Sequence, residues 1–268
     1  MLADRIEYEV ISIPPYIFGY EKDADFAKKW SRTYNDALAE ICLTHSGKFI
    51  ALGTLPMQDV SFAVEELRHC LYDLHFPGFE LGSQINGEDL DSEKLSPVFE
   101  EANKHGCAIL IHPFNVPPPP RMESYYTNNL VGNPSETALT ATRLLLSGFF
   151  GRYPNIRVCL SHGGGSFPYI YSRIKHGFSV RPEPHIAHIA SVEIPPNMYA
   201  DSIVYEEINY QFLSQVMGPT QICMGSDYPF DMQLTSPVNK LESWCLTRQE
   251  LQLALRKNSN MWLFGGCK

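Results

Sequence analysis

The chain has 268 residues, of which 44% are hydrophobic and 12% aromatic, enough for one large core. Its net charge of −9 leaves no basic surface of the kind that binds nucleic acid or an anionic membrane, and no apolar run approaches the roughly 20 residues of a membrane span. The seven cysteines are scattered without a C-x-x-C pair, and the N-terminus lacks the apolar core of a signal peptide. We therefore expect reduced thiols, no structural zinc site and a cytoplasmic protein.

Apolar strand-like runs alternate with amphipathic helical patterns along the chain. The predicted strands are 8–13, 49–55, 78–83, 108–112, 158–162, 197–202 and 221–227. The predicted helices are 23–45, 60–74, 92–105, 135–150, 167–178, 206–217 and 237–264. No repeat or linker divides the chain, so we predict a single domain over residues 1–268.

This alternation predicts an α/β fold with a parallel sheet. Seven strand–helix units come one strand short of a TIM-type (β/α)8 barrel, so we predict an incomplete barrel. A doubly wound open sheet is the alternative, but no Gly-rich phosphate loop follows the first strand.

A long segment, 114–133, interrupts the alternation. It holds four consecutive prolines at 117–120, and its length is typical of a lid or a binding loop. We expect Asn133 or Ser135 to cap the helix that follows.

The stretch 158–165, VCLSHGGG, carries the strongest functional signal. A buried strand ends here in His162, and three glycines then let the backbone turn sharply. Because parallel α/β folds carry their chemistry at the carboxyl ends of the strands, His162 is a candidate catalytic residue. The alternative is a core histidine in a glycine-rich loop.

Other polar residues also stand at predicted strand ends. They are Ser83, His112, His162, Asp201 and Asp227. Two histidines and an aspartate that converge over a barrel mouth would suit a borderline metal such as zinc. Each has a structural alternative: Asp227 a turn cap, His112 a bond to a backbone carbonyl, and Asp201 a pair with an arginine.

Five motifs occur along the chain: GTLPMQ at 53–58, IHP at 111–113, LVGNPSET at 130–137, SHGGG at 161–165 and GSDYPF at 225–230. Together they resemble the amidohydrolase superfamily, in the branch of 2-amino-3-carboxymuconate-6-semialdehyde decarboxylase and related aromatic-acid decarboxylases. The resemblance runs from about residue 6 to residue 264 in the family's order.

The resemblance implies a role for each matching residue. His112 and Asp227 would be metal ligands, and His162 the acid/base beside a metal-activated water. Arg173 and Arg181 stand where the decarboxylases keep arginines, one of which would reach a substrate carboxylate across a homodimer interface. A structural salt bridge is the alternative for each arginine.

The sequence departs from the family at two places. Asn129 stands where the decarboxylase keeps an aromatic residue, so we expect it to bear on the choice of substrate. The family's first strand, with its His-x-His pair of metal ligands, has no counterpart in this sequence. Zn²⁺ or another divalent metal would then be held weakly, since stable catalytic zinc sites have three protein ligands.

The resemblance thus implies non-oxidative, metal-dependent decarboxylation of a small unsaturated or aromatic carboxylic acid. A metal-dependent hydrolase of a lactone or amide, or an inactive dimerising homologue, remains an alternative. The chain would be a truncated form, a natural short form, or one in which another segment fills the gap.

Overall fold

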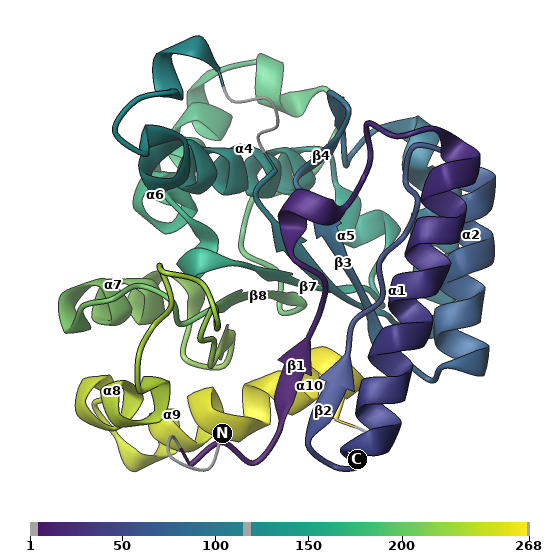
Figure 1. Cartoon of the computed structure of the whole chain (residues 1–268). Coiled ribbons are helices and arrows are strands. Elements are labelled where there is room, and N and C mark those ends of the chain that lie inside the picture. The colour runs from purple at the N-terminus through teal and green to yellow at the C-terminus, as the bar shows by residue number, and fades with distance from the viewer. Residues whose placement is uncertain (1–4, 115–118, 267–268) are drawn as a thin grey trace.

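Seven parallel strands form the middle of the molecule in the computed structural model, which describes residues 5–114 and 119–266 (Figure 1). In chain order they are β1 (Glu9–Ile11), β2 (Phe49–Ala51), β3 (Gly78–Gly82), β6 (Ala108–His112), β7 (Arg157–Leu160), β8 (Met198–Asp201) and β9 (Ile222–Cys223). All seven are shorter than or equal in length to the runs that predict them.

The strands lie side by side in the order of the chain. β1 pairs with β2, and β3, β6, β7, β8 and β9 form a second parallel ladder. A bridge between Gly53 and Phe79 joins the two ladders. Sequential parallel strands with intervening helices are the arrangement of a (β/α) barrel. Within the described residues β1 and β9 each pair on one side only, so the barrel is incomplete, as predicted.

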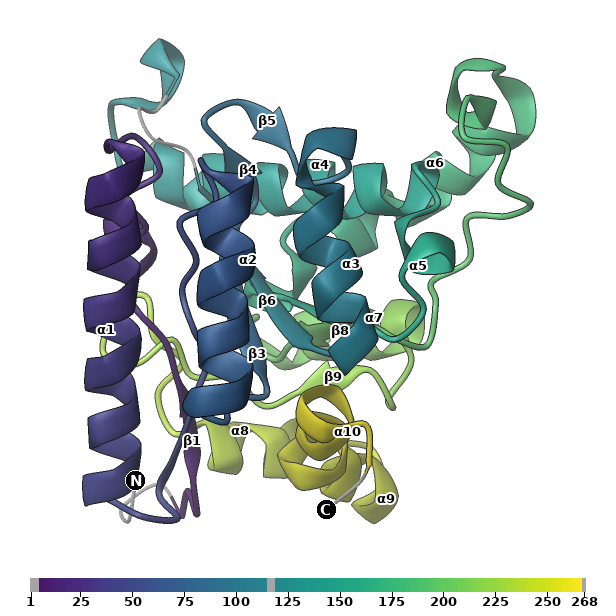
Figure 2. The ribbon, with the colours of Figure 1, turned by 90° about the vertical axis from the view of Figure 1, so that its right-hand side faces the viewer.

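The helices cover the outside of the sheet. They are α1 (Ala24–Thr44), α2 (Val60–Arg68), α3 (Ser96–His105), α4 (Asn133–Leu146), α5 (Phe149–Arg152), α6 (Phe167–Val180), α7 (Glu207–Met217), α8 (Pro237–Trp244), α9 (Arg248–Gln252) and α10 (Asn258–Phe264). Figure 2 shows α1, α2 and α3 standing next to one another over one side, with α8, α9 and α10 at the lower end. In the described part of the chain, none of them is long and apolar enough to cross a membrane.

Two apolar clusters stabilise this arrangement. The larger lies between the helices and the sheet, whereas the smaller fills the inside of the sheet. The members of the inner cluster are Leu52, Ala108, Cys159, Tyr199, Cys223, Trp262 and Leu263. Trp262 reaches it from α10, where its indole N–H donates to the carbonyl oxygen of Arg157 on β7. The six cysteines among the described residues are free thiols, and Cys267 lies outside those residues.

All strands except β6 end earlier than predicted, and β7 and β9 are the two that leave site residues beyond their ends. β7 ends at Leu160 rather than at His162, and β9 ends at Cys223 rather than at Asp227. The reason lies in the backbone, because His162 and Asp227 have positive φ angles of 54° and 59°, which a strand does not accommodate. Both residues therefore sit in loops beyond the strand ends.

A short antiparallel hairpin was not predicted. It consists of β4 (Gln84–Ile85) and β5 (Glu88–Asp89) and turns at Asn86 and Gly87, whose φ angles are 51° and 85°. Asn-Gly is the preferred pair for this kind of tight turn, so the signal was present in the sequence.

The described part of the segment 114–133 is largely ordered into turns. A 3₁₀ turn spans Pro120–Met122 and a π-helical turn spans Asn128–Gly132, while Pro117 and Pro118 lie outside the described residues. The predicted cap of the next helix is wrong. α4 continues the π-helical turn without a side-chain cap, and the Ser135 hydroxyl donates to the Val131 carbonyl oxygen.

Candidate active site

Four of the residues predicted from strand ends line one cavity of about 700 Å³. His112 is the last residue of β6 and Asp201 the last of β8. His162 comes two residues after β7, and Asp227 four residues after β9. Because these strands are parallel, their carboxyl ends bring the four side chains to the same edge of the sheet.

Asp201 holds the loop that carries His162. Its carboxylate accepts hydrogen bonds from the backbone N–H groups of His162 at 2.8 Å, Gly163 at 2.7 Å and Ile203 at 2.9 Å. A Cβ on Gly163 would lie 2.4 Å from Cγ1 of Val204, so the loop packs tightly at this point. Asp201 is a positioning residue for His162, and within the described residues it makes these bonds rather than the arginine pair considered from the sequence.

The two histidines face each other. The ring centroids of His112 and His162 are 4.9 Å apart, with an angle of 81° between the planes. Nδ1 of His112 lies 2.8 Å from the carbonyl oxygen of Pro113. A carbonyl only accepts, so Nδ1 carries the hydrogen and Nε2 keeps a free lone pair. Burial, together with the neighbouring His162, lowers the pKa of His112 to about 3, so its ring is neutral at pH 7.

His162 has the opposite electrostatic environment. Its Nε2 atom lies 3.7 Å from Oδ2 of Asp227. Burial lowers the pKa of His162, but the interactions with Asp227 and the charge of Asp201 outweigh it, so the pKa is raised overall. Two neighbouring imidazoles thus differ in their affinity for a proton, which is typical of a site that separates a ligand from an acid/base.

His112 and Asp227 suit a divalent metal ion. A neutral imidazole with its Nδ1–H bound to a backbone carbonyl is the usual state of a metal-ligating histidine, and Asp227 adds a carboxylate. Residues 5–114 and 119–266 contain no group of three or more His, Cys, Asp or Glu side chains placed to hold one ion. Among the described residues, the donors for such an ion are therefore limited to His112 and Asp227.

The predicted substrate-binding residues lie apart from the cavity lining. Asn129 is half-buried in the π-helical turn 128–132, and Arg173 is exposed on α6. Arg181, also exposed, pairs with Glu183. None of these three side chains lines the cavity. Their roles in substrate binding stay predictions.

Two further residues belong to β3 or follow it directly. Ser83 is buried, donates to Glu136 at 3.0 Å and accepts from the N–H of Phe114 at 2.9 Å, so it connects β3 to neighbouring elements. Glu80, in the middle of β3, lines the cavity and was missed. A charged residue inside the apolar run GFELGS was the signal that could have identified it.

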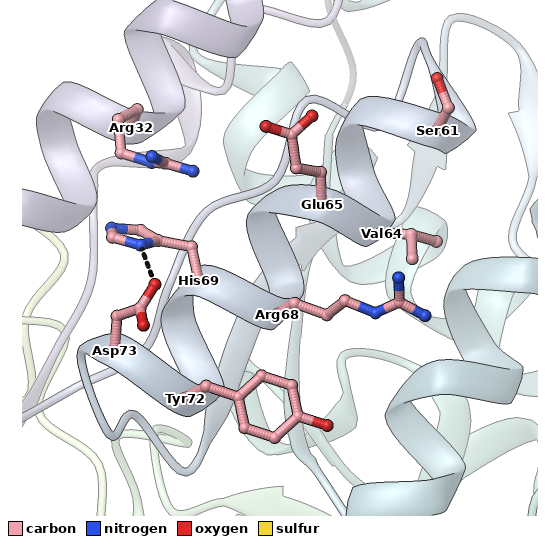
Figure 3. A pocket seen from close by; sticks show the side chains of 8 residues that line it. All are labelled: Arg32, Ser61, Val64, Glu65, Arg68, His69, Tyr72 and Asp73. Carbon is pink, nitrogen blue, oxygen red and sulfur yellow. Dashed lines mark hydrogen bonds and ion pairs between the residues drawn. The ribbon is translucent and has the colours of Figure 1, made fainter.

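A second hollow, of about 330 Å³, lies between α1 and α2 (Figure 3). Its charged side chains already have partners on the protein. The pairs are Arg32 with Glu66, Arg68 with Glu101, Lys28 with Glu65, and His69 with Asp36 and Asp73. This hollow therefore has no free charged group that would mark it as a binding site.

The chain is similar to several decarboxylases in sequence. It is 38% identical over 242 residues to 2-amino-3-carboxymuconate-6-semialdehyde decarboxylase of Dictyostelium discoideum, covering 90% of this chain and 67% of that protein. It is 28% identical over 262 residues to gamma-resorcylate decarboxylase of Rhizobium sp. (strain MTP-10005), covering 86% of this chain and 75% of that protein.

Solved structures share the fold. The 2,6-dihydroxybenzoate decarboxylase from Rhizobium superposes with a TM-score of 0.85 at 25% identity, covering 98% of this chain and 85% of that one. The 5-carboxyvanillate decarboxylase from Novosphingobium aromaticivorans, solved with manganese and 4-hydroxy-3-methoxy-5-nitrobenzoic acid, gives 0.87 at 24% identity, covering 98% and 78%.

The family model for amidohydrolases matches residues 10–263, nearly the whole of the described chain. The match confirms the resemblance carried by the sequence motifs, and the incomplete barrel with His112, His162 and Asp227 in one cavity agrees with it. The chain belongs to the amidohydrolase family.

Proposed function

We propose that the chain is a metal-dependent, non-oxidative decarboxylase of a small unsaturated or aromatic carboxylic acid. The observation that carries the proposal is the convergence of His112, His162 and Asp227 on one cavity at the carboxyl ends of parallel strands. The sequence relatives named as decarboxylases support the reaction class.

His162 would act as the acid/base. Asp227 and Asp201 raise its pKa, and Asp201 fixes its position through the backbone. His162 would deliver a proton to the substrate carbon that bears the carboxylate, and a π bond of the substrate supplies the electron pair for the new C–H bond. The carbon–carboxylate bond then breaks, and its electron pair restores the π bond. Carbon dioxide then leaves, and the proton stays on carbon.

His112, through Nε2, and Asp227 would hold the metal ion. When bound, a divalent ion supplies Lewis acidity and a lowered pKa for water. We propose Zn²⁺ as the ion, with another divalent metal as the alternative, held weakly by only two described ligands.

Asn129, Arg173 and Arg181 are the proposed substrate-binding residues. Arg173 and Arg181 are exposed on one protomer, so either would have to reach the substrate of a second copy, and we propose a homodimer for this reason. An arginine suits a carboxylate because its guanidinium is always charged and binds in two-pronged fashion.

We also propose that residues 1–268 form one domain and that the protein is cytoplasmic. The family match over residues 10–263 supports the first proposal. The free thiols of the six described cysteines support the second, because disulfides are rare in the cytosol.

Release of carbon dioxide from a panel of aromatic and unsaturated acids, with Zn²⁺ or Mn²⁺ added, tests the proposed reaction. We expect release by the wild-type chain, loss in His162→Gln, and no change in His176→Gln, whose side chain is exposed on α6. Hydrolysis of a lactone or amide by the same preparation would favour the hydrolase. A stable dimer without turnover of any substrate would favour the inactive homologue.

A further inference from the structure

Glu80 is a buried carboxyl group inside the sheet. It is the central residue of β3, whose five residues are all buried, and only 2% of its surface is exposed. Its backbone N–H donates to the carbonyl oxygen of Gly53 at 2.8 Å, so the strand is hydrogen-bonded on this side as well as to β6. Carboxyl groups are rarely buried to this extent without a cationic partner.

The carboxyl group of Glu80 is only half satisfied. The Ser12 side chain hydrogen-bonds to it, whereas Oε2 has no hydrogen-bond partner within the described ranges. Residues 5–114 and 119–266 also give it no ion pair with Lys, Arg or His. Burial raises the pKa of Glu80 to about 8, with a further contribution from Asp227, so the group is largely protonated at pH 7.

Glu80 faces the same cavity as the candidate active site. In the strand register Gly82 stands opposite His112, and Glu80 stands opposite Leu110. Glu80 is therefore one inward-facing position deeper than His112, a displacement along the strand of roughly 6.6 Å. The cavity thus carries the metal-ligand and acid/base residues at the carboxyl ends of the strands, and the carboxyl group of Glu80 lies one inward-facing position below them.

We propose that Glu80 binds a neutral hydrogen-bonding substituent of the substrate, of which a ring hydroxyl is the simplest case, one inward-facing position below His112 in the cavity. The unpartnered Oε2 atom and the position of Glu80 in this cavity carry the inference. The inference rests on the proposed function, because it assigns a binding residue to a substituent that the acid carries in addition to the carboxylate it loses.

A neutral substituent matches the surroundings of Glu80 better than a charged one. A protonated carboxyl group both donates and accepts, as a hydroxyl does. A second carboxylate placed here would meet the negative field of Asp227, and an ammonium group would need Glu80 to ionise in a buried position.

Binding measurements on matched ligands test the proposal. The probes are benzoate, 3-hydroxybenzoate, 4-hydroxybenzoate and phenol, each titrated by calorimetry into wild type, Glu80→Leu and Glu80→Gln. Glu80→Leu replaces a buried polar group by an apolar one of similar size, so the fold should tolerate it. Glu101→Gln, at a buried carboxylate outside the cavity, is the matched control.

We expect wild type to bind at least one hydroxybenzoate about tenfold more tightly than benzoate, the effect of one well-placed hydrogen bond. Glu80→Leu should lose most of this ratio while benzoate binds as before, Glu80→Gln should keep part of it, and Glu101→Gln all of it. A ratio that is unchanged in Glu80→Leu would overturn the inference.

Phenol separates this inference from the proposed reaction. Phenol binding that depends on Glu80, without carbon dioxide release from any acid, supports the role of Glu80 and counts against decarboxylation. Carbon dioxide release without a Glu80-dependent preference for hydroxybenzoates supports decarboxylation and counts against the role of Glu80. If none of the probes binds wild type, the role of Glu80 is overturned.

Discussion

The carboxylate of Asp201 holds the backbone of His162, with 2.8 Å between Oδ2 and the His162 nitrogen. His162 has a φ angle of 54°, an uncommon conformation for a residue with a side chain, and the bonds from Asp201 to it and to Gly163 stabilise this conformation. The position of the proposed acid/base therefore depends on a residue at the end of the neighbouring strand, β8.

Asp201→Asn should disturb this arrangement. An amide has one accepting oxygen and an NH₂ group that would face backbone N–H donors, so at least one of the three bonds is lost. We expect a loss of about 2 kcal/mol in the free energy of unfolding and a fall in kcat larger than any rise in KM. Urea unfolding and the carbon dioxide assay measure the two effects. Asp231→Asn, at an exposed position, should change neither, and an equal effect in both variants would contradict the role of Asp201.

Gly163→Ala should displace the same loop. The added Cβ would lie 2.4 Å from Cγ1 of Val204, and the φ angle of 63° disfavours a side chain. We expect destabilisation by about 1–3 kcal/mol. Gly151→Ala is the comparison, because its Cβ would meet open space within the short helix α5, where alanine is the better residue. In thermal unfolding, Gly163→Ala should melt well below wild type, whereas Gly151→Ala should melt at or above it.

Glu101 should make stability depend on pH below 5. Arg68 and Lys104 hold its pKa at about 2, below the ordinary 4.5. A pKa that is lower in the folded state contributes stability above pH 4.5, and this contribution disappears as the pH falls towards 2. Because the side chains of Arg68 and Lys104 are more than half exposed, we expect Glu101→Gln to cost only about 1 kcal/mol at pH 7.

Urea unfolding of wild type and Glu101→Gln at pH 7, 4 and 2.5 checks this sign. The difference between the two should be largest at pH 7 and shrink towards pH 2.5. If the difference in the free energy of unfolding grows on acidification, Glu101 does not stabilise the fold through these ion pairs.

Asn35 should be among the most sensitive positions of α1. It is fully buried, accepts from the N–H of Thr54 at 2.8 Å, and donates to the carbonyl oxygen of Thr54 and to Glu66. Asn35→Ala leaves these groups without their partner, so we expect a loss of about 2–4 kcal/mol in chemical denaturation. Asn35→Asp should cost at least as much because it places a carboxylate against Glu66. A change under 1 kcal/mol in both would contradict this.

The order of the strands and helices could be predicted from the sequence because each strand is a short apolar run and each helix has a clear apolar stripe. The spacing of residues along the chain also placed His112 and His162 at one edge of the sheet. The exact strand ends could not be predicted, since the positive φ angles of His162 and Asp227 are imposed by the folded loops around them.

The role of Asp201 could not be predicted from the sequence either. Two of its three N–H donors are at His162 and Gly163, 38 to 39 residues earlier in the chain, and no local sequence pattern predicts such a contact. Glu80 differs, because a glutamate in a run predicted to be buried is visible in the sequence. Only the structure shows that one of its oxygens has no partner among the described residues.

The central claim is that His112 and Asp227 hold a divalent metal at the candidate active site. Calorimetric titration of Mn²⁺ into the purified chain tests it most directly, because Mn²⁺ favours oxygen and imidazole ligands over the free thiols. We predict one weak site per chain, with affinity reduced at least about tenfold in both His112→Gln and Asp227→Asn and unchanged in His176→Gln. Equal affinity in all four proteins, or no binding by wild type, would contradict the account.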